Sequence, residues 1–120
     1  MDDPFSPLNT LDSKFYKNLD KSFSTNKKNI SVESKSIDEI ISLSDIKTDI
    51  DFINIDVEGS DYKILTQIDI QKLKPKLISI ETHNVDGSES ENFQNINDYL
   101  INNNFSIFKR VGPTTLFDHN

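Results

Sequence analysis

The chain has 120 residues, enough for one modest domain and too few for two. Its formal net charge of -7 excludes a basic surface for nucleic acid or anionic lipid. It contains no cysteine, which excludes disulfides and thiolate chemistry, and no apolar run approaches the roughly 18 residues of a membrane span. The polar N-terminus lacks the apolar region of a signal peptide, so we expect a cytoplasmic protein.

Residues 1–28 are predicted to form an irregular or helical N-terminal segment, distinct from residues 29–120. Pro4 and Pro7 interrupt any early element. Apolar side chains then recur every four residues, a spacing that fits a short amphipathic helix and equally fits a loop packed over the core. These side chains are Leu11, Phe15, Leu19 and Phe23.

The next stretch predicts a strand followed by a helix. Residues 30–34 alternate apolar and polar side chains, as a half-buried strand does. Ser36 and Glu39 have the spacing of a capping box, in which each side chain binds a backbone N–H of the other's turn. We expect this helix to end near Ser44 and to bury Ile37, Ile40 and Ile41.

A short β-branched run at residues 52–57 predicts a strand that is buried on both faces. Gly59 ends the run, and Ser60 is then the expected N-cap of a helix over residues 60–69. By the two-residue period of a strand, Asn54, Asp56 and Glu58 share one side. Carboxylates therefore gather at the carboxyl end of a strand, which is where open α/β sheets bind their ligands.

The remaining elements repeat the alternation of strand and helix. Pro75 marks a boundary, and residues 76–83 predict a second buried strand that ends in Glu81 and His83, on one face. A loop at residues 86–88 follows. The spacing of Phe93, Ile96 and Leu100 predicts a helix that the asparagine run 102–104 stops. Residues 105–111 and 114–117, separated by Gly112 and Pro113, predict an antiparallel pair.

Strands that alternate with helices indicate an α/β fold with a parallel sheet and right-handed crossover helices. The two final strands add a closing antiparallel hairpin to that sheet.

The sequence of residues 50–65, IDFINIDVEGSDYKIL, resembles the signature of FkbM-family methyltransferases. Further similar stretches are residues 36–40, 74–81 and 105–117, with a weaker one at 8–11, so the resemblance covers residues 8–118. It implies a Rossmann-like class I methyltransferase sheet in which residues 51–57 are the fourth strand and 77–82 the fifth, with 105–118 as the hairpin. It also implies S-adenosylmethionine as cofactor and O-methylation of a small-molecule or saccharide acceptor.

The same resemblance implies that this chain is the carboxyl-terminal half of such a domain, a partial sheet lacking the first strands. The three glycines, Gly59, Gly87 and Gly112, are isolated, and none makes the Gly-x-Gly turn that lets backbone approach a cofactor. The family's first strand would lie beside residues 51–57, so its absence would leave an unpaired edge. We therefore expect homo-oligomerisation or a partner that supplies the complementing N-terminal half.

Asp56 and Glu58 are the leading candidates for catalysis, either by orienting or deprotonating an acceptor hydroxyl. Asp56 is also a candidate contact for the ammonium group of the cofactor, and Gly59 is assigned to the cofactor site through its sharp turn. The structural alternative is that Glu58 stabilises a helix N-terminus while Asp56 binds turn amides.

Asn54, Asp61 and Glu81 are expected to hold the side chains of this site in position through contacts with them. Asn54 lies within a predicted buried run and would need partners there, and Asp61 also suits the first turn of a helix without any function.

His83 is the third catalytic candidate, as a general base. Asp56, Glu81 and His83 together would suit a divalent cation, but exposed histidines at strand ends are common, and we assign no metal.

Two other functions compete with methyl transfer. A non-catalytic α/β interaction module derived from a methyltransferase would keep the scaffold without the chemistry. Metal-dependent hydrolysis by the acidic and histidine cluster has less support from the sequence.

Overall fold

The computed structural model describes residues 30–44, 49–57 and 59–120. The chain divides into two units, Met1–Ser34 and Lys35–Asn120, and every helix and strand named below belongs to the second. The helix expected between residues 11 and 23 lies outside the described residues, as does the weaker similarity at 8–11.

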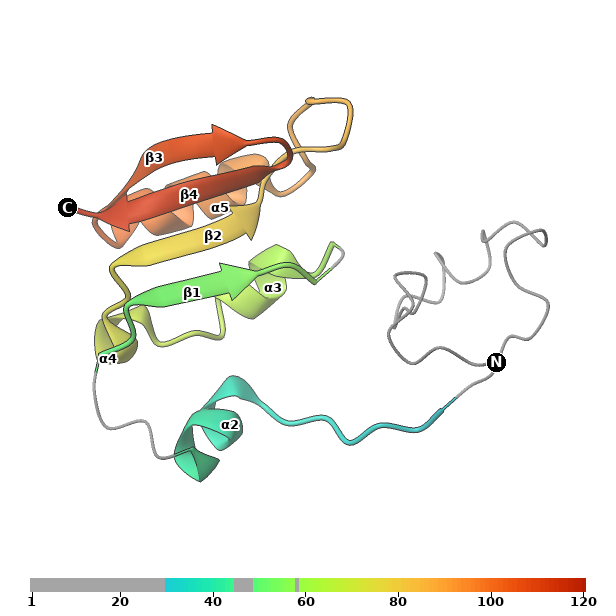
Figure 1. Cartoon of the computed structure of the whole chain (residues 1–120), viewed down its shortest axis with the longest axis vertical. Helices are drawn as coiled ribbons and strands as arrows, with labels where there is room; N and C mark the ends of the chain where they lie inside the picture. The colour runs from blue at the N-terminus through green and yellow to red at the C-terminus, as the bar shows by residue number, and fades with distance from the viewer. Residues whose placement is uncertain (1–29, 45–48, 58) are drawn as a thin grey trace. The chain divides into compact units, whose positions relative to one another are not determined.

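A four-stranded mixed sheet forms the centre of the second unit (Figure 1). Its strands lie in the order β1 (Phe52–Ile55), β2 (Leu77–Glu81), β4 (Thr114–His119) and β3 (Phe105–Val111). β1 and β2 are parallel, whereas β4 is antiparallel to both of its neighbours. The α/β class, the parallel pair and the closing hairpin predicted from the sequence are therefore confirmed.

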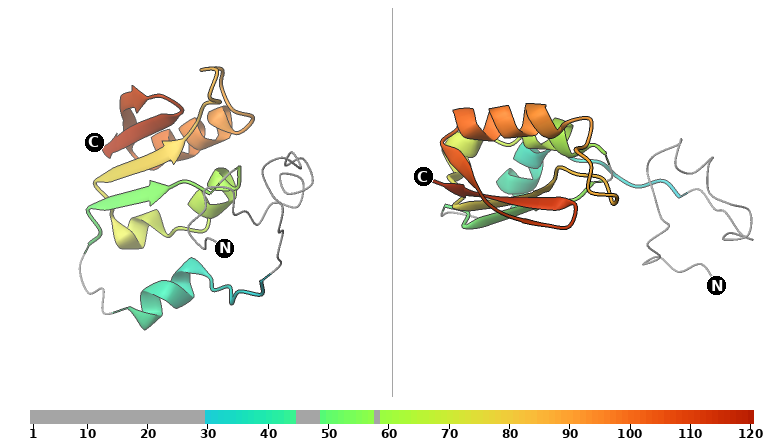
Figure 2. Two further views of the ribbon diagram at one scale, coloured as in Figure 1. Left: turned by 45° about the vertical axis from the view of Figure 1, so that its right-hand side comes forward. Right: turned by 90° about the horizontal axis from the view of Figure 1, so that it is seen from above.

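Helices α3 (Asp61–Leu65), α4 (Ile70–Leu73) and α5 (Phe93–Asn102) lie on one side of the sheet (Figure 2). Side chains from these helices and from the strands form one apolar core. Its largest fully buried members are Phe105, Phe117, Leu65, Ile78, Ile80, Ile96 and Leu100. α5 has the predicted extent, and the positive φ of 65° at Asn104 confirms the expected left-handed stop.

The capping box before α2 (Ile37–Leu43) is present, with the Ser36 hydroxyl accepting from the Glu39 backbone N–H. Hydrogen bonds from the backbone N–H and the hydroxyl of Ser36 hold the pKa of the Glu39 carboxyl below its usual value. Ser44 is the C-cap, as expected. Burial of Ile40 was predicted wrongly, because it points to solvent while Ile37 and Ile41 pack partly against the core.

Two other local predictions were wrong. Residues 30–34, all of them described, form no strand, and Ile30 and Val32 are 72% and 61% exposed. An alternating sequence is not stable as a strand unless a neighbouring strand pairs with it. The helix expected over residues 60–69 is shorter than predicted, because α3 ends at Leu65. A separate helix, α4, begins after Asp69, whose carboxylate accepts from the Lys72 N–H.

β1 is an edge strand of the described sheet, and only Ile55 of its four residues is buried. Burial on both faces was therefore predicted wrongly. Strand register places Phe52, Leu77 and Leu116 on the face opposite to the helices. Phe52 is 51% exposed, and Leu77 and Leu116 are half-buried, so no helix of the described part of the chain covers this face. No described strand pairs with the outer edge of β1.

No helix in the part of the chain that the structure describes is long and apolar enough to cross a bilayer.

The open edge and face of β1 predict concentration-dependent self-association. Replacing Phe52 with lysine places a charge on the exposed face and should shift the sedimentation coefficient towards that of a monomer. Val85→Lys is the matched control, because Val85 is 98% exposed in a loop and its replacement should leave association unchanged. A monomer at every concentration for the unmodified chain would contradict the prediction.

Candidate functional site

The turn between β1 and α3 shapes the site at the carboxyl end of β1. The Asp61 side chain is 5% exposed, and its two carboxylate oxygens accept from the backbone N–H groups of Val57 (3.3 Å) and Gly59 (3.1 Å). Gly59 adopts φ +88°, a conformation that is strained for other residues. The chain therefore leaves β1 at Ile55 and reverses, because Asp61 binds amides that would otherwise continue the strand.

This role of Asp61 differs from the one that the sequence suggests. Ser60 occupies the N-cap position of α3 but makes no side-chain cap hydrogen bond. Asp61, in the first turn, instead reaches back to the preceding loop. The carboxylate thus serves to shape the turn, and the sequence signal for it is the acid two residues after the glycine.

A polar cleft with a volume of about 240 Å³ lies beside this turn, at the carboxyl ends of the parallel pair β1 and β2. Gly59 and Asp61 line it on the β1 side, and Glu81 and His83 on the β2 side. The loop before α5 and the helix itself complete the wall with Asn84, Ser90, Glu91, Asn92 and Ile96. The residues that line the cleft thus include three acids and one histidine, at the place where α/β sheets bind ligands.

The loop after β2 fixes His83 within this wall. The backbone N–H groups of Thr82 and His83 both donate to the Pro113 carbonyl oxygen, at 3.0 and 3.1 Å. The imidazole packs against the Phe93 ring, with the centroids 5.2 Å apart, and its Nδ1 lies 2.8 Å from the Thr82 hydroxyl oxygen. His83 is therefore held by both backbone and ring contacts.

Beyond His83 the chain makes a tight turn. Asp86 accepts from the backbone N–H and the hydroxyl of Ser88, and these bonds hold the pKa of the Asp86 carboxyl below its usual value. Asn84 donates to the Ser88 hydroxyl and the Glu89 carbonyl. The loop predicted at residues 86–88 is confirmed, and Ser88 of this loop holds the side chain of Asn84, which lines the cleft.

The predicted site residues do not all meet in the cleft. Gly59, Asp61, Glu81 and His83 do. Asp56 follows β1 as an exposed side chain and is not among the lining residues, while Glu58 lies outside the described residues.

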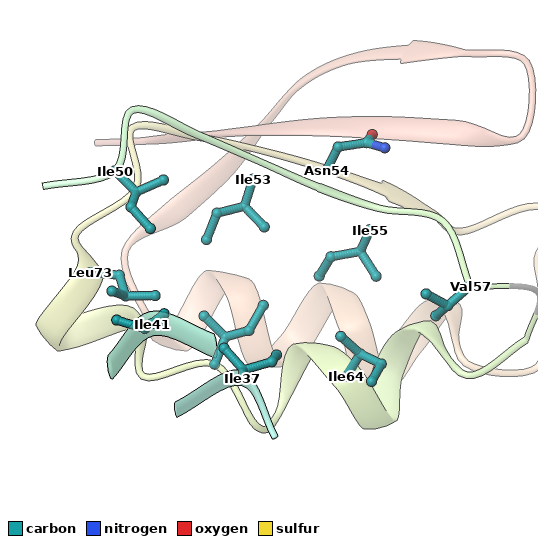
Figure 3. A pocket seen from close by; sticks show the side chains of 10 residues that line it. Ile37, Ile41, Ile50, Ile53, Asn54, Ile55, Val57, Ile64 and Leu73 are labelled. Carbon is teal, nitrogen blue, oxygen red and sulfur yellow. The ribbon is translucent and has the colours of Figure 1, made fainter. Parts of the chain in front are cut away.

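Asn54 was predicted to lie in a buried run and to brace Asp56. That burial was predicted wrongly: Asn54 is exposed, because β1 is an edge strand of the described sheet and no described helix covers its outer face. The Asn54 side chain points away from Ile53 and Ile55 (Figure 3).

The divalent-cation set considered from the sequence, Asp56 with Glu81 and His83, is not assembled. Within the described ranges, no three histidine, aspartate or glutamate side chains are grouped so as to hold a metal ion.

A second hollow of about 240 Å³ differs in chemistry from the polar cleft. It lies between α2, β1, α3 and α4, and apart from Asn54 its lining is apolar (Figure 3). The lining side chains are Ile37, Ile41, Ile50, Ile53, Ile55, Val57, Ile64, Ile68 and Leu73. It offers no group for acid–base chemistry, so the polar cleft is the candidate site.

Sequence reasoning missed two groups of cleft residues. Asn84 and residues 90–92 come from a loop whose path depends on tertiary structure. Thr82 and Thr115 lie behind His83, fully buried and 2.6 Å apart between their hydroxyl oxygens. Only the cross-strand register of β2 and β4 brings these two threonines together, and no local pattern reports that register.

An α/β sheet with a polar cleft at the carboxyl ends of parallel strands is the architecture of a ligand-binding or catalytic α/β protein. The family model described as the methyltransferase FkbM domain matches residues 3–107, most of the chain. The chain therefore belongs to the FkbM methyltransferase family. No curated protein and no solved structure matches it in the corresponding comparisons.

Replacing Asp61 with alanine should lower the free energy of unfolding by about 2 kcal/mol, because two hydrogen bonds to a charged acceptor are lost. Asp61→Asn keeps one acceptor oxygen, so the free energy of unfolding of this variant should lie between those of Asp61→Ala and the parent. Asp56→Ala is the matched control: an exposed aspartate nearby, expected to change stability by less than about 0.5 kcal/mol. Urea unfolding provides the measurement, and equal effects at Asp56 and Asp61 would refute the assigned role.

Proposed function

We propose that the chain contributes the acceptor side of an S-adenosylmethionine-dependent O-methyltransferase, whose substrate is a hydroxyl group of a sugar or secondary metabolite. The polar cleft carries the proposal: the residues that line it include one histidine and three acids, at the carboxyl ends of two parallel strands. Membership in a methyltransferase family supplies the reaction class. The family resemblance implies a saccharide or small-molecule acceptor, and the polar side chains of the cleft suit the hydroxyl groups of such a molecule.

The size of the cleft favours one small polar group. Its volume of about 240 Å³ is below the roughly 300–1,000 Å³ of a drug-sized ligand pocket, so it suits one sugar ring or a comparable hydroxylated unit. Asn84, Ser90 and Asn92 offer both donors and acceptors to such a unit. These uncharged groups would fix the acceptor in the position that methyl transfer requires.

The described residues suit only part of the methyl donor. A sulfonium and an ammonium group are cationic, and carboxylates of the cleft wall and the exposed Asp56 nearby are suitable partners for them. The nucleoside part finds no glycine-rich turn, since each of the three glycines is isolated in the sequence. When bound, such a donor supplies an electrophilic methyl group, while the cleft residues act on the acceptor.

The acceptor hydroxyl must be held and must lose its proton. Glu81, at the end of β2, and His83 line the same cleft from one strand end, so both reach an acceptor placed there. A carboxylate accepts hydrogen bonds only, which suits it to receive a hydroxyl proton. Positioning contributes most of the rate enhancement in this chemistry, with modest help from a base.

Methyl transfer from tritiated S-adenosylmethionine to a panel of hydroxylated acceptors tests the proposal. His83→Ala and Glu81→Gln should each lower kcat/KM by roughly 100-fold, the typical contribution of a positioned acid–base group. His119→Ala and Glu89→Gln are the matched controls, because both residues are exposed and neither lines the cleft. Transfer that survives both cleft substitutions unchanged would place the acceptor elsewhere.

A further inference from the structure

Two buried threonines connect the interior of the sheet to the imidazole of the cleft. The Thr115 hydroxyl oxygen lies 2.6 Å from that of Thr82, which in turn lies 2.8 Å from His83 Nδ1. Thr82 and Thr115 are 0% and 2% exposed. The three side chains therefore form a short hydrogen-bonded row with one end in the core and the other at the site.

The direction of the hydrogen bonds follows from counting protons. Each hydroxyl has one proton to donate, and a neutral imidazole has one N–H and one bare nitrogen. If Thr115 donates to Thr82 and Thr82 donates to His83 Nδ1, both hydroxyl protons are used. The bare nitrogen is then Nδ1, and the ring proton is on Nε2.

The reverse direction leaves a buried donor without a partner. If Nδ1–H donates to Thr82, one hydroxyl proton is left over: either Thr82 donates to Thr115, or Thr115 also donates to Thr82 and the Thr82 proton has no acceptor among the described residues. In the former case the Thr115 hydroxyl proton has no further acceptor among the described residues, at a position where only 2% of the residue is exposed. A buried unsatisfied donor is unfavourable, so the first arrangement is preferred.

We propose that Thr82, whose oxygen accepts from the Thr115 hydroxyl, is the positioning residue that fixes neutral His83 as the Nε2–H tautomer. His83 then presents a hydrogen-bond donor to the cleft instead of a base. This inference rests on the proposed function for its consequence: the Nε2–H group donates to the acceptor oxygen, and a cleft carboxylate, Glu81 or Glu91, receives the hydroxyl proton. It replaces the general-base role that the sequence suggests for His83.

Long-range proton–nitrogen correlation spectra of the full chain, labelled with ¹⁵N-histidine, test the tautomer directly. The chain has two histidines, so exposed His119 provides an internal reference in the same spectrum. The spectra are recorded at about pH 8.5, where an ordinary imidazole is neutral. The ratio of the Nε2–H to the Nδ1–H tautomer should be roughly fivefold higher for His83 than for His119, which is the size of effect that one net hydrogen bond produces. Equal ratios, or a dominant Nδ1–H form at His83, would overturn the proposal.

Two pairs of variants separate the hydroxyl effect from packing. Thr82→Val removes the donor to Nδ1 and should bring the tautomer ratio of His83 to that of His119, while Thr82→Ser should restore it. Thr115→Val should leave the ratio near the parent value, because the Thr82 proton then has only Nδ1 as an acceptor among the described residues, and Thr115→Ser should preserve the ratio too. A ratio that does not change when the Thr82 hydroxyl is removed would also overturn the proposal.

The two proposals fail in distinguishable ways. The spectra need no methyl donor and no acceptor, so a chain that has the predicted tautomer but binds no hydroxylated acceptor in the cleft refutes only the proposed function. An active chain whose His83 is the Nδ1–H tautomer refutes only the positioning role of Thr82. If a valine variant does not fold, the spectrum of the unmodified chain still decides the tautomer.

Discussion

The contact between the Asp61 carboxylate and the backbone amides of Val57 and Gly59 sets the geometry of the site. These bonds end β1 and redirect the chain into α3, with Gly59 in a left-handed conformation. Parallel pairing of β1 with β2 then brings this turn beside Glu81 and His83. Because strand, turn and cleft depend on one nearly buried acid, stability and site geometry are coupled at that residue.

The sheet combines a well-packed interior with an open boundary. Phe105, Phe117 and the isoleucines of β2 bury one face beneath the helices, whereas Phe52 on the other face remains half exposed. β1 also carries the stretch that resembles the family signature, so the segment that shapes the cleft belongs to an edge strand of the described sheet. A partner that pairs with β1 would therefore act next to the cleft and influence its geometry.

The sequence predicts the elements whose information is local. Ser36 and Glu39 indicate the start of α2, the spacing of Phe93, Ile96 and Leu100 indicates α5, and Gly112 with Pro113 separates the hairpin strands. Errors arise where tertiary context decides, as at Asn54, whose exposure depends on the edge position of β1. The site is predicted in part. Glu81 and His83, which line the cleft, follow from the alternation of side chains along residues 76–83. The contact between Thr82 and Thr115 joins residues 33 positions apart in the sequence and depends on how β2 pairs with β4, which no local pattern reports.

The most direct test of the cleft as the acceptor site is an NMR titration of the full chain with S-adenosylhomocysteine, with and without a hydroxylated acceptor. The amide and imidazole resonances are followed during the titration. We expect saturable shifts at Gly59 and His83, with the acceptor adding shifts at Asn84 and Ser90, because these residues line one cleft. A well-dispersed spectrum in which neither compound moves the cleft resonances, or in which shifts occur only around the apolar hollow beneath α2, would contradict that assignment.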